Sequence, residues 1–102
     1  MIIKFNNLYL EALAQDETKG KPKYNDKVVY KFRKTLKILQ HVPDTKSLWT
    51  LNGLGFERLK GDKKELFSVR VDYHYRLIFK IEQDVINIRE ILIINELTNH
   101  YQ

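Results

Sequence analysis

FSVRVDYHYRLIF, at residues 67–79, has the pattern of a tight antiparallel hairpin. Its first half alternates apolar and polar residues with a period of two, and its second half is rich in aromatic and branched residues. Asp72-Tyr73-His74 is a short polar break between the two halves. A loop of these three residues places Arg70 directly opposite Arg76 on one face of the hairpin.

Two arginines side by side on an open face predict a surface that meets an anion. Like charges directly opposite each other destabilise a sheet, and an anion held between them reverses that effect. Arginine is also the side chain best suited to forked binding of phosphate, so Arg70 and Arg76 indicate a phosphate-facing surface. Two alternatives stay open. A two-residue loop would move the arginines to opposite faces, or both are solvated side chains without a function.

The residues before the hairpin predict one strand and two helices. Residues 1–5 have the pattern of a strand, and Asn6-Asn7 can cap a helix that runs to about Gln15. A second helix begins after Asn25 and ends before Pro43, which cannot continue it. Its apolar residues recur at helical spacing and are expected in the core: Val29, Phe32, Leu36 and Leu39. Helices that precede a meander of strands predict an α+β domain, with the two helices packed on one face of an antiparallel or mixed sheet of four to five strands.

The remaining segments predict shorter features. Residues 44–55 suit a single helical turn that contains Trp49, which we expect to pack in the core or against a helix. Residues 85–88 alternate like a strand, whereas residues 91–94 are continuously apolar and suit a central strand covered on both sides. The alternation changes phase at Arg89-Glu90, which predicts a bulge or bend there.

Length and composition predict a single cytosolic domain over residues 1–102. The chain has no cysteine, so it has neither a disulfide framework nor thiolate chemistry. No apolar run approaches the length of a membrane span, and residues 1–5 are too short for a signal peptide.

The positive charge is concentrated in one segment. The chain holds 18 Lys and Arg against 13 Asp and Glu, a net charge of +5. Within residues 19–37, Asp26 is the only acid among these bases: Lys19, Lys21, Lys23, Lys27, Lys31, Arg33, Lys34 and Lys37. This segment indicates a surface for a polyanion or an acidic partner, and the alternative is a solvated helix face that keeps the protein soluble.

The residue inventory favours chemistry without a metal or cofactor. His41, His74 and His100 are far apart in sequence and have no ligand spacing around them, and the Leu59-Lys60-Gly61-Asp62 turn lacks the spacing of a phosphate loop. RNA can be cut without a metal, because its 2′-hydroxyl is a built-in nucleophile. Such cleavage needs a base, an acid and cations against the oxyanion.

Several residues can fill these roles. His100 can donate or accept a proton near neutral pH and Glu57 can act as a base. The cations available for the oxyanion are Arg58, Lys60, Arg70 and Arg76. Tyr101 can stack on a base. Each also has an ordinary explanation: a histidine near a chain end is often a frayed surface residue, and Glu57-Arg58 can be an exposed ion pair.

The same segments resemble the HigB-type branch of the RelE/ParE toxin superfamily. The resemblance is carried by GFERLKGD at 55–62, Lys64, FSVRV at 67–71, YRLIF at 75–79 and Asn99-His100-Tyr101. It is close over the second half of the chain and extends to the first half only in layout. It implies a RelE-like fold and a toxin of a type II toxin-antitoxin system. Such toxins bind the ribosomal decoding site and cleave mRNA there without a metal or another cofactor.

The resemblance also implies site residues and partners. By position it implies catalytic roles for Lys60, Arg70, Arg76 and His100, with Glu57 where the family often has histidine. Thr98-Asn99 stands where the family has aspartate-tyrosine, so the base and the acid stay open. Candidate RNA-binding residues are Arg58, Tyr101, Lys63, Lys64, Lys31 and Lys34. The implied partners are the ribosome, mRNA and a helix-turn-helix antitoxin of the HigA type, with operator DNA bound only through that antitoxin.

Two other functions remain open at this point. One is a ParE-like inhibitor of DNA gyrase, which shares the fold but acts through protein contacts. The other is a non-catalytic relic that still binds RNA or an antitoxin.

Overall fold

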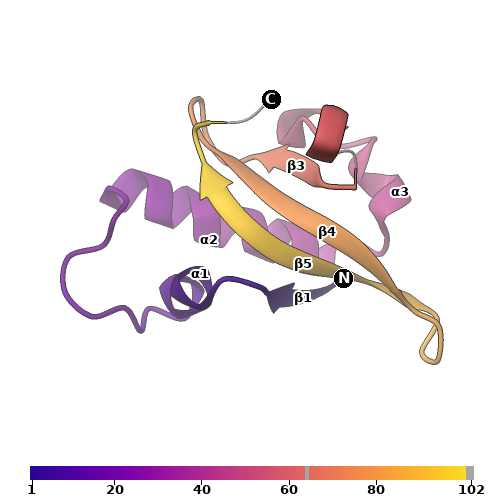
Figure 1. Cartoon of the computed structure of the whole chain (residues 1–102), viewed down its shortest axis with the longest axis horizontal. Helices are drawn as coiled ribbons and strands as arrows, with labels where there is room; N and C mark the ends of the chain where they lie inside the picture. The colour runs from indigo at the N-terminus through magenta and orange to yellow at the C-terminus, as the bar shows by residue number, and fades with distance from the viewer. Residues whose placement is uncertain (64, 101–102) are drawn as a thin grey trace.

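In residues 1–63 and 65–100, which the computed structural model describes, five strands form one mixed sheet in the order β1-β5-β4-β3-β2 (Figure 1). The strands are β1 (Ile2–Phe5), β2 (Glu57–Arg58), β3 (Phe67–Arg70), β4 (Arg76–Asp84) and β5 (Arg89–Thr98). β1 lies parallel to β5, and the other neighbours are antiparallel. The predicted α+β class is confirmed, and the apolar strand β5 is an inner strand between β1 and β4 as expected.

Each helix begins at a side-chain cap. The helices are α1 (Leu8–Ala14), α2 (Asp26–His41) and α3 (Thr45–Leu48), and two 3₁₀ turns follow at η1 (Asn52–Leu54) and η2 (Gly61–Lys63). The side chains of Asn7, Asn25 and Asp44 each accept a hydrogen bond from the first turn of the helix that follows. The helix starts predicted at Asn6-Asn7 and at Asn25 are therefore confirmed. Across residues 1–63 and 65–100, no helix is long and apolar enough to cross a membrane.

One face of the sheet carries the core. α1 and α2 bury their apolar stripes against this face, and Figure 1 shows α2 lying behind the strands. The buried side chains include Leu10, Leu13, Val29, Phe32, Leu36, Leu39, Val69, Leu77, Phe79, Leu92 and Ile94. Burying this much apolar surface is the main force that holds the helices on the sheet.

The β3–β4 hairpin has the predicted register. Arg70 pairs with Arg76, so the two arginines share a face of the sheet, opposite the face that α1 and α2 cover. The loop is held by Asp72, whose Oδ1 accepts hydrogen bonds from the backbone N–H groups of His74 and Tyr75 at 2.8 and 2.7 Å. This local turn chemistry places both arginines at the same end of the sheet.

The prediction of a strand at residues 85–88 is wrong. These residues form the turn between β4 and β5, at the tip of a hairpin that extends beyond the other strands in Figure 1. Val85, Ile86 and Ile88 are 82–91% exposed, and Ile88 has a positive φ of 52°. The segment forms a turn because local hydrogen bonds hold it. Its alternating apolar side chains do not form a strand because no other element packs against them.

The predicted bulge lies elsewhere. The ladder shifts register between Ile78 and Phe79, which pair with Glu96 and Ile94, so Asn95 is the additional residue. The extra residue lets Ile94 and Leu97, three positions apart, both face the core. Arg89-Glu90, where we expected the irregularity, lies in regular pairing with β4.

Trp49 differs from its predicted position as well. Its side chain is 58% exposed and packs against the Phe56 ring in a T-shaped arrangement, with the ring centroids 4.5 Å apart. α3 has only four residues and buries Leu48, so the tryptophan that follows lies on the surface.

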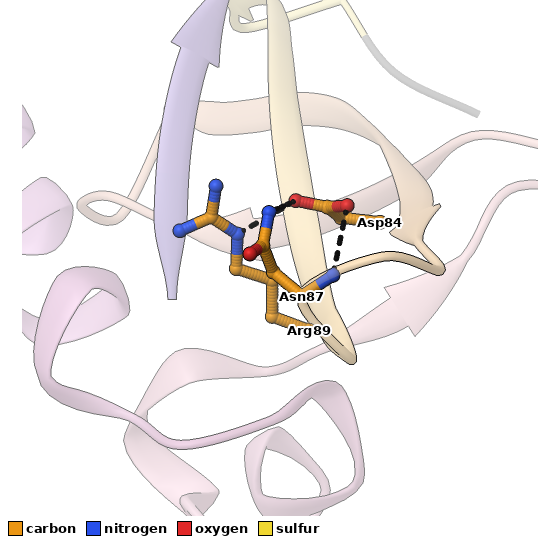
Figure 2. Close-up of polar contacts among 3 residues, drawn as sticks. All are labelled: Asp84, Asn87 and Arg89. Carbon is orange, nitrogen blue, oxygen red and sulfur yellow. Dashed lines mark hydrogen bonds and ion pairs between the residues drawn. The ribbon is translucent and has the colours of Figure 1, made fainter.

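A compact polar network holds the tip of the β4–β5 hairpin (Figure 2). Asp84 accepts hydrogen bonds from Asn87 Nδ2 at 2.9 Å, from the Asn87 backbone N–H at 3.3 Å and from Arg89 Nε at 2.8 Å. These donors, with Asn87 contributing most, lower the pKa of Asp84 to about 2.

This network predicts a pH dependence. Since the folded pKa of Asp84 is depressed, its contribution to stability is present above the unfolded pKa of about 4 and is lost as pH falls toward 2. A carboxyl NMR titration should give a midpoint for Asp84 near 2. Asn87→Ala should move that midpoint upward because it removes the leading donor. A wild-type midpoint at the ordinary aspartate value would contradict the network.

Candidate functional site

Two guanidinium groups converge beside Gly55. Gly55 has a φ of 53°, and a Cβ atom at this residue would lie 3.4 Å from Arg70 Nη2 and 3.5 Å from Arg76 Nη1. The two guanidinium groups therefore lie at the same point, which their paired register on one face allows. Glycine suits this position because its backbone is left-handed, a conformation that other residues rarely adopt.

Arg76 is a buried cation in a fixed orientation. It is 5% exposed, and its Nε donates a hydrogen bond to Ser68 Oγ at 2.9 Å. Nη2 donates to the backbone oxygen of Gly55 and lies 3.8 Å from Glu57 Oε1. The Glu57 side chain is about half exposed, so water screens much of its attraction for Arg76. These contacts hold the guanidinium in one orientation.

The arginines line a cleft of about 500 Å³ that we call the arginine cleft. Its described lining residues are Lys31, Gly53, Arg70, Val71, Asp72, Tyr73 and Arg76. Three are cations and one is an acid, and the acid already accepts hydrogen bonds within the hairpin loop. The cleft can therefore bind an anionic group such as a phosphodiester.

Helix α2 brings two of the predicted RNA-binding lysines to this region. Lys31 lines the arginine cleft, and Lys31 and Lys34 also line an adjoining hollow that includes Arg70. These lysines are distant from the hairpin in sequence, so only the packing of α2 on the sheet brings them beside the arginines.

Tyr73 is a cleft residue that sequence reasoning did not select. It is 91% exposed, at the tip of the β3–β4 loop, and its ring meets the ring of His74 edge-on at 5.5 Å between centroids. An exposed aromatic ring beside cations is a stacking surface for an unpaired base. The sequence feature that could have indicated Tyr73 is its position in a hairpin loop between two arginines.

The two residues of β2 point to opposite faces of the sheet. Glu57 pairs with Ser68 and so shares the face of the arginines, whereas Arg58 pairs with Phe67 and has its guanidinium over that ring at 5.6 Å. Lys60 is exposed after β2 and does not line the arginine cleft. Lys63 ends η2, and the predictions for Lys64 and Tyr101 lie outside the described residues.

His100 lies at the same end of the sheet as the arginines. Thr98 pairs with Arg76, and the backbone N–H of His100 donates to Thr98 Oγ1 at 2.9 Å. The histidine is exposed, and in the part of the chain that the structure describes no hydrogen bond joins its imidazole to either arginine. Nor do any three His, Asp or Glu side chains gather there in a way that could hold a metal ion.

Comparisons with known proteins identify a family and a fold for this chain. A family model described as a RelE-like toxin of the type II toxin-antitoxin system HigB matches residues 3–91. The match ends before His100. A search of curated proteins found no match.

Two solved structures share the fold. A YoeB/ParE toxin from Agrobacterium tumefaciens has a TM-score of 0.61 at 18% identity and covers 99% of this chain and 100% of its own. A YoeB-YefM complex from Staphylococcus aureus has a TM-score of 0.58 at 22% identity, over 99% of this chain and 98% of that one. At these identities the likeness concerns the fold alone, and it confirms the RelE-like fold.

Proposed function

The chain belongs to the HigB-like family of RelE-like toxins of type II toxin-antitoxin systems, and on that premise we propose that it is a ribosome-dependent mRNA endoribonuclease. The observation that carries this proposal is the convergence of Arg70 and the buried Arg76 beside Gly55. A fixed cation, Arg76, and an exposed one, Arg70, at the same point can hold a scissile phosphate and stabilise the extra negative charge of its transition state.

The proposed reaction uses the RNA's own 2′-hydroxyl as the nucleophile. A base takes the 2′-proton, O2′ attacks the phosphorus, the bond from phosphorus to O5′ breaks, and an acid protonates O5′. The products are a 2′,3′-cyclic phosphate and a 5′-hydroxyl end. Glu57, 3.8 Å from Arg76, is our candidate base and His100 our candidate acid.

The other residues bind and orient the RNA. Lys31 and Lys34 extend the positive surface from the arginine cleft along α2, where they meet neighbouring phosphates. Tyr73 stacks on a base next to the scissile bond, a role that Tyr101 can share. Lys60, Arg58, Lys63 and Lys64 contact RNA or the ribosome from the segment that precedes β3.

The proposed partners follow from the family. We propose that a cognate antitoxin binds and silences the protein; one structure of similar fold is a YoeB-YefM complex from S. aureus. We assign this partner to the helix-turn-helix type, through which the complex reaches operator DNA. The ribosome and mRNA place the activity in the cytoplasm.

A reconstituted translation reaction tests this function. The purified protein should cut mRNA on translating ribosomes and leave the same mRNA intact without ribosomes. The new 5′ ends should accept a phosphate from polynucleotide kinase without prior phosphatase treatment, because they carry a hydroxyl. Equal cutting of naked RNA would reject ribosome dependence, and 5′-phosphate ends would reject 2′-hydroxyl attack. Intact mRNA together with inhibited gyrase supercoiling would instead support the ParE-like alternative.

A further inference from the structure

A continuous groove runs along the outer side of α2. Two hollows of about 490 and 520 Å³ share Lys34, Ile38, Thr50 and Leu51, so they form one depression between α2 and the α3–η1 segment. We call this depression the α2 groove. Along α2 it extends from Tyr30 to His41, which is about 17 Å or three helical turns.

The α2 groove has an apolar floor and one basic edge. Ile38, Val42, Pro43, Leu51 and Leu54 supply the floor. Lys31, Lys34, Lys37 and His41 follow one another along α2 at spacings of three or four residues, so they lie on one side of the helix. The opposite edge is neutral and polar, with Ser47, Thr50 and Asn52. No aspartate or glutamate is among the described residues that line either hollow.

From these features we infer that the α2 groove binds an acidic amphipathic helix of a protein partner. The floor needs aliphatic side chains, and the basic edge needs carboxylates along one flank of the same segment. A helix with apolar residues at i, i+3, i+4 and i+7 meets both needs. An added β-strand does not, because the helix backbone along this edge is already hydrogen-bonded within α2.

RNA fits the α2 groove less well than a peptide. Phosphates can pair with the lysines, but the floor between them is aliphatic and gives bases no stacking surface. The aromatic rings of the lining, Tyr30 and His41, stand at the two ends of the groove and not on its floor. RNA is therefore better matched to the arginine cleft, where Tyr73 lies beside the cations.

The α2 groove also leads into the arginine cleft. Lys31 and Arg70 line both the groove and the cleft. A helix seated in the groove with its acidic flank toward Lys31 therefore brings a carboxylate next to Arg70. It competes there with the RNA phosphate. The identification of the partner as the antitoxin, and of this contact as its means of inhibition, rests on the proposed function. The inference that the groove binds an acidic amphipathic helix does not rest on the proposed function.

Paired variants test the α2 groove in the complex with the cognate antitoxin. Ile38→Glu puts a carboxylate into the floor, and Lys37→Glu reverses one charge on the edge. Each should weaken the complex by about 30-fold, as expected for loss of a central contact. The matched controls are Ile86→Glu at the exposed hairpin tip and Lys19→Glu in the loop before α2, and both should leave affinity unchanged.

The readouts separate the groove from the nuclease proposal. Free Ile38→Glu and Lys37→Glu protein should cut mRNA at the wild-type rate and resist the antitoxin. If the groove variants bind the antitoxin more weakly but neither they nor the wild type cut mRNA, the proposal for the groove stands and the nuclease proposal is rejected. Equal affinity of groove and control variants would overturn the groove. Two further results would overturn the proposal for the groove. One is that the segment of the antitoxin protected from hydrogen exchange in the complex is basic or extended. The other is that an RNA oligonucleotide displaces the antitoxin from Ile38 and Leu51 while the contacts of Arg70 stay unchanged.

Discussion

Arg70→Ala is expected to reduce mRNA cleavage on ribosomes by about 100-fold or more, the usual loss for one donor of an oxyanion site. The same change should leave the fold intact and raise the free energy of unfolding slightly. The side chain of Arg70 is exposed and, among residues 1–63 and 65–100, makes no hydrogen bond or salt bridge. It stands directly opposite Arg76, so its removal relieves a like-charge contact worth about 0.2–1 kcal/mol.

This combination of lower activity and equal or higher stability distinguishes a functional arginine from a structural one. Arg70→Lys should retain part of the activity, because lysine keeps the charge but loses the planar fork. Lys80→Ala is the control, since Lys80 is an exposed cation of β4 outside the arginine cleft. Cleavage assays and urea unfolding on the same preparations give both quantities. Wild-type cleavage by Arg70→Ala would remove this residue from the site.

The features that the sequence predicted correctly depend on local chemistry. The register of Arg70 against Arg76 follows from a loop closed by Asp72, and the helix starts follow from the side chains of Asn7 and Asn25. Each of these arrangements is decided by residues fewer than ten positions apart. Alternation, turn length and capping therefore suffice to predict them.

The features that it missed depend on contacts between distant segments. Residues 85–88 alternate like a strand, but nothing packs on them and the Asp84 network makes them a turn. The bulge at Asn95 arises because Ile94 and Leu97 must both reach a core built by the helices. In the same way, the arginine cleft acquires Lys31 only through the docking of α2.

The burial of Arg76 also could not be read from the hairpin. Its pairing with Arg70 predicts two exposed cations, whereas Arg76 is covered because its guanidinium reaches Gly55 and Ser68. Ser68 is on the same hairpin, but Gly55 comes from the turn after η1. The long-range contact with Gly55 thus gives Arg76 a structural role that Arg70 lacks.

For this reason Arg76→Ala is expected to lower both stability and activity. We expect the free energy of unfolding to fall by about 2–6 kcal/mol, because Ser68 Oγ and the Gly55 oxygen each lose a buried partner at about 1–3 kcal/mol. Cleavage should fall by about 100-fold or more even at temperatures where the variant is folded, because the second cation at the phosphate is gone.

Two further variants separate the structural and catalytic roles of Arg76. Ser68→Ala removes the acceptor of Nε but keeps both cations, so it should cost about 1 kcal/mol and reduce cleavage less than Arg76→Ala does. Arg89→Ala removes an arginine that is half-exposed and bonded to Asp84 at the hairpin tip, so it should lower stability much less than Arg76→Ala does and leave cleavage unchanged. Unfolding in urea and single-turnover cleavage measure the two effects separately. Equal stability of the Arg76→Ala and Arg89→Ala proteins would mean that burial does not hold Arg76 in place, and the site would then lose its fixed cation.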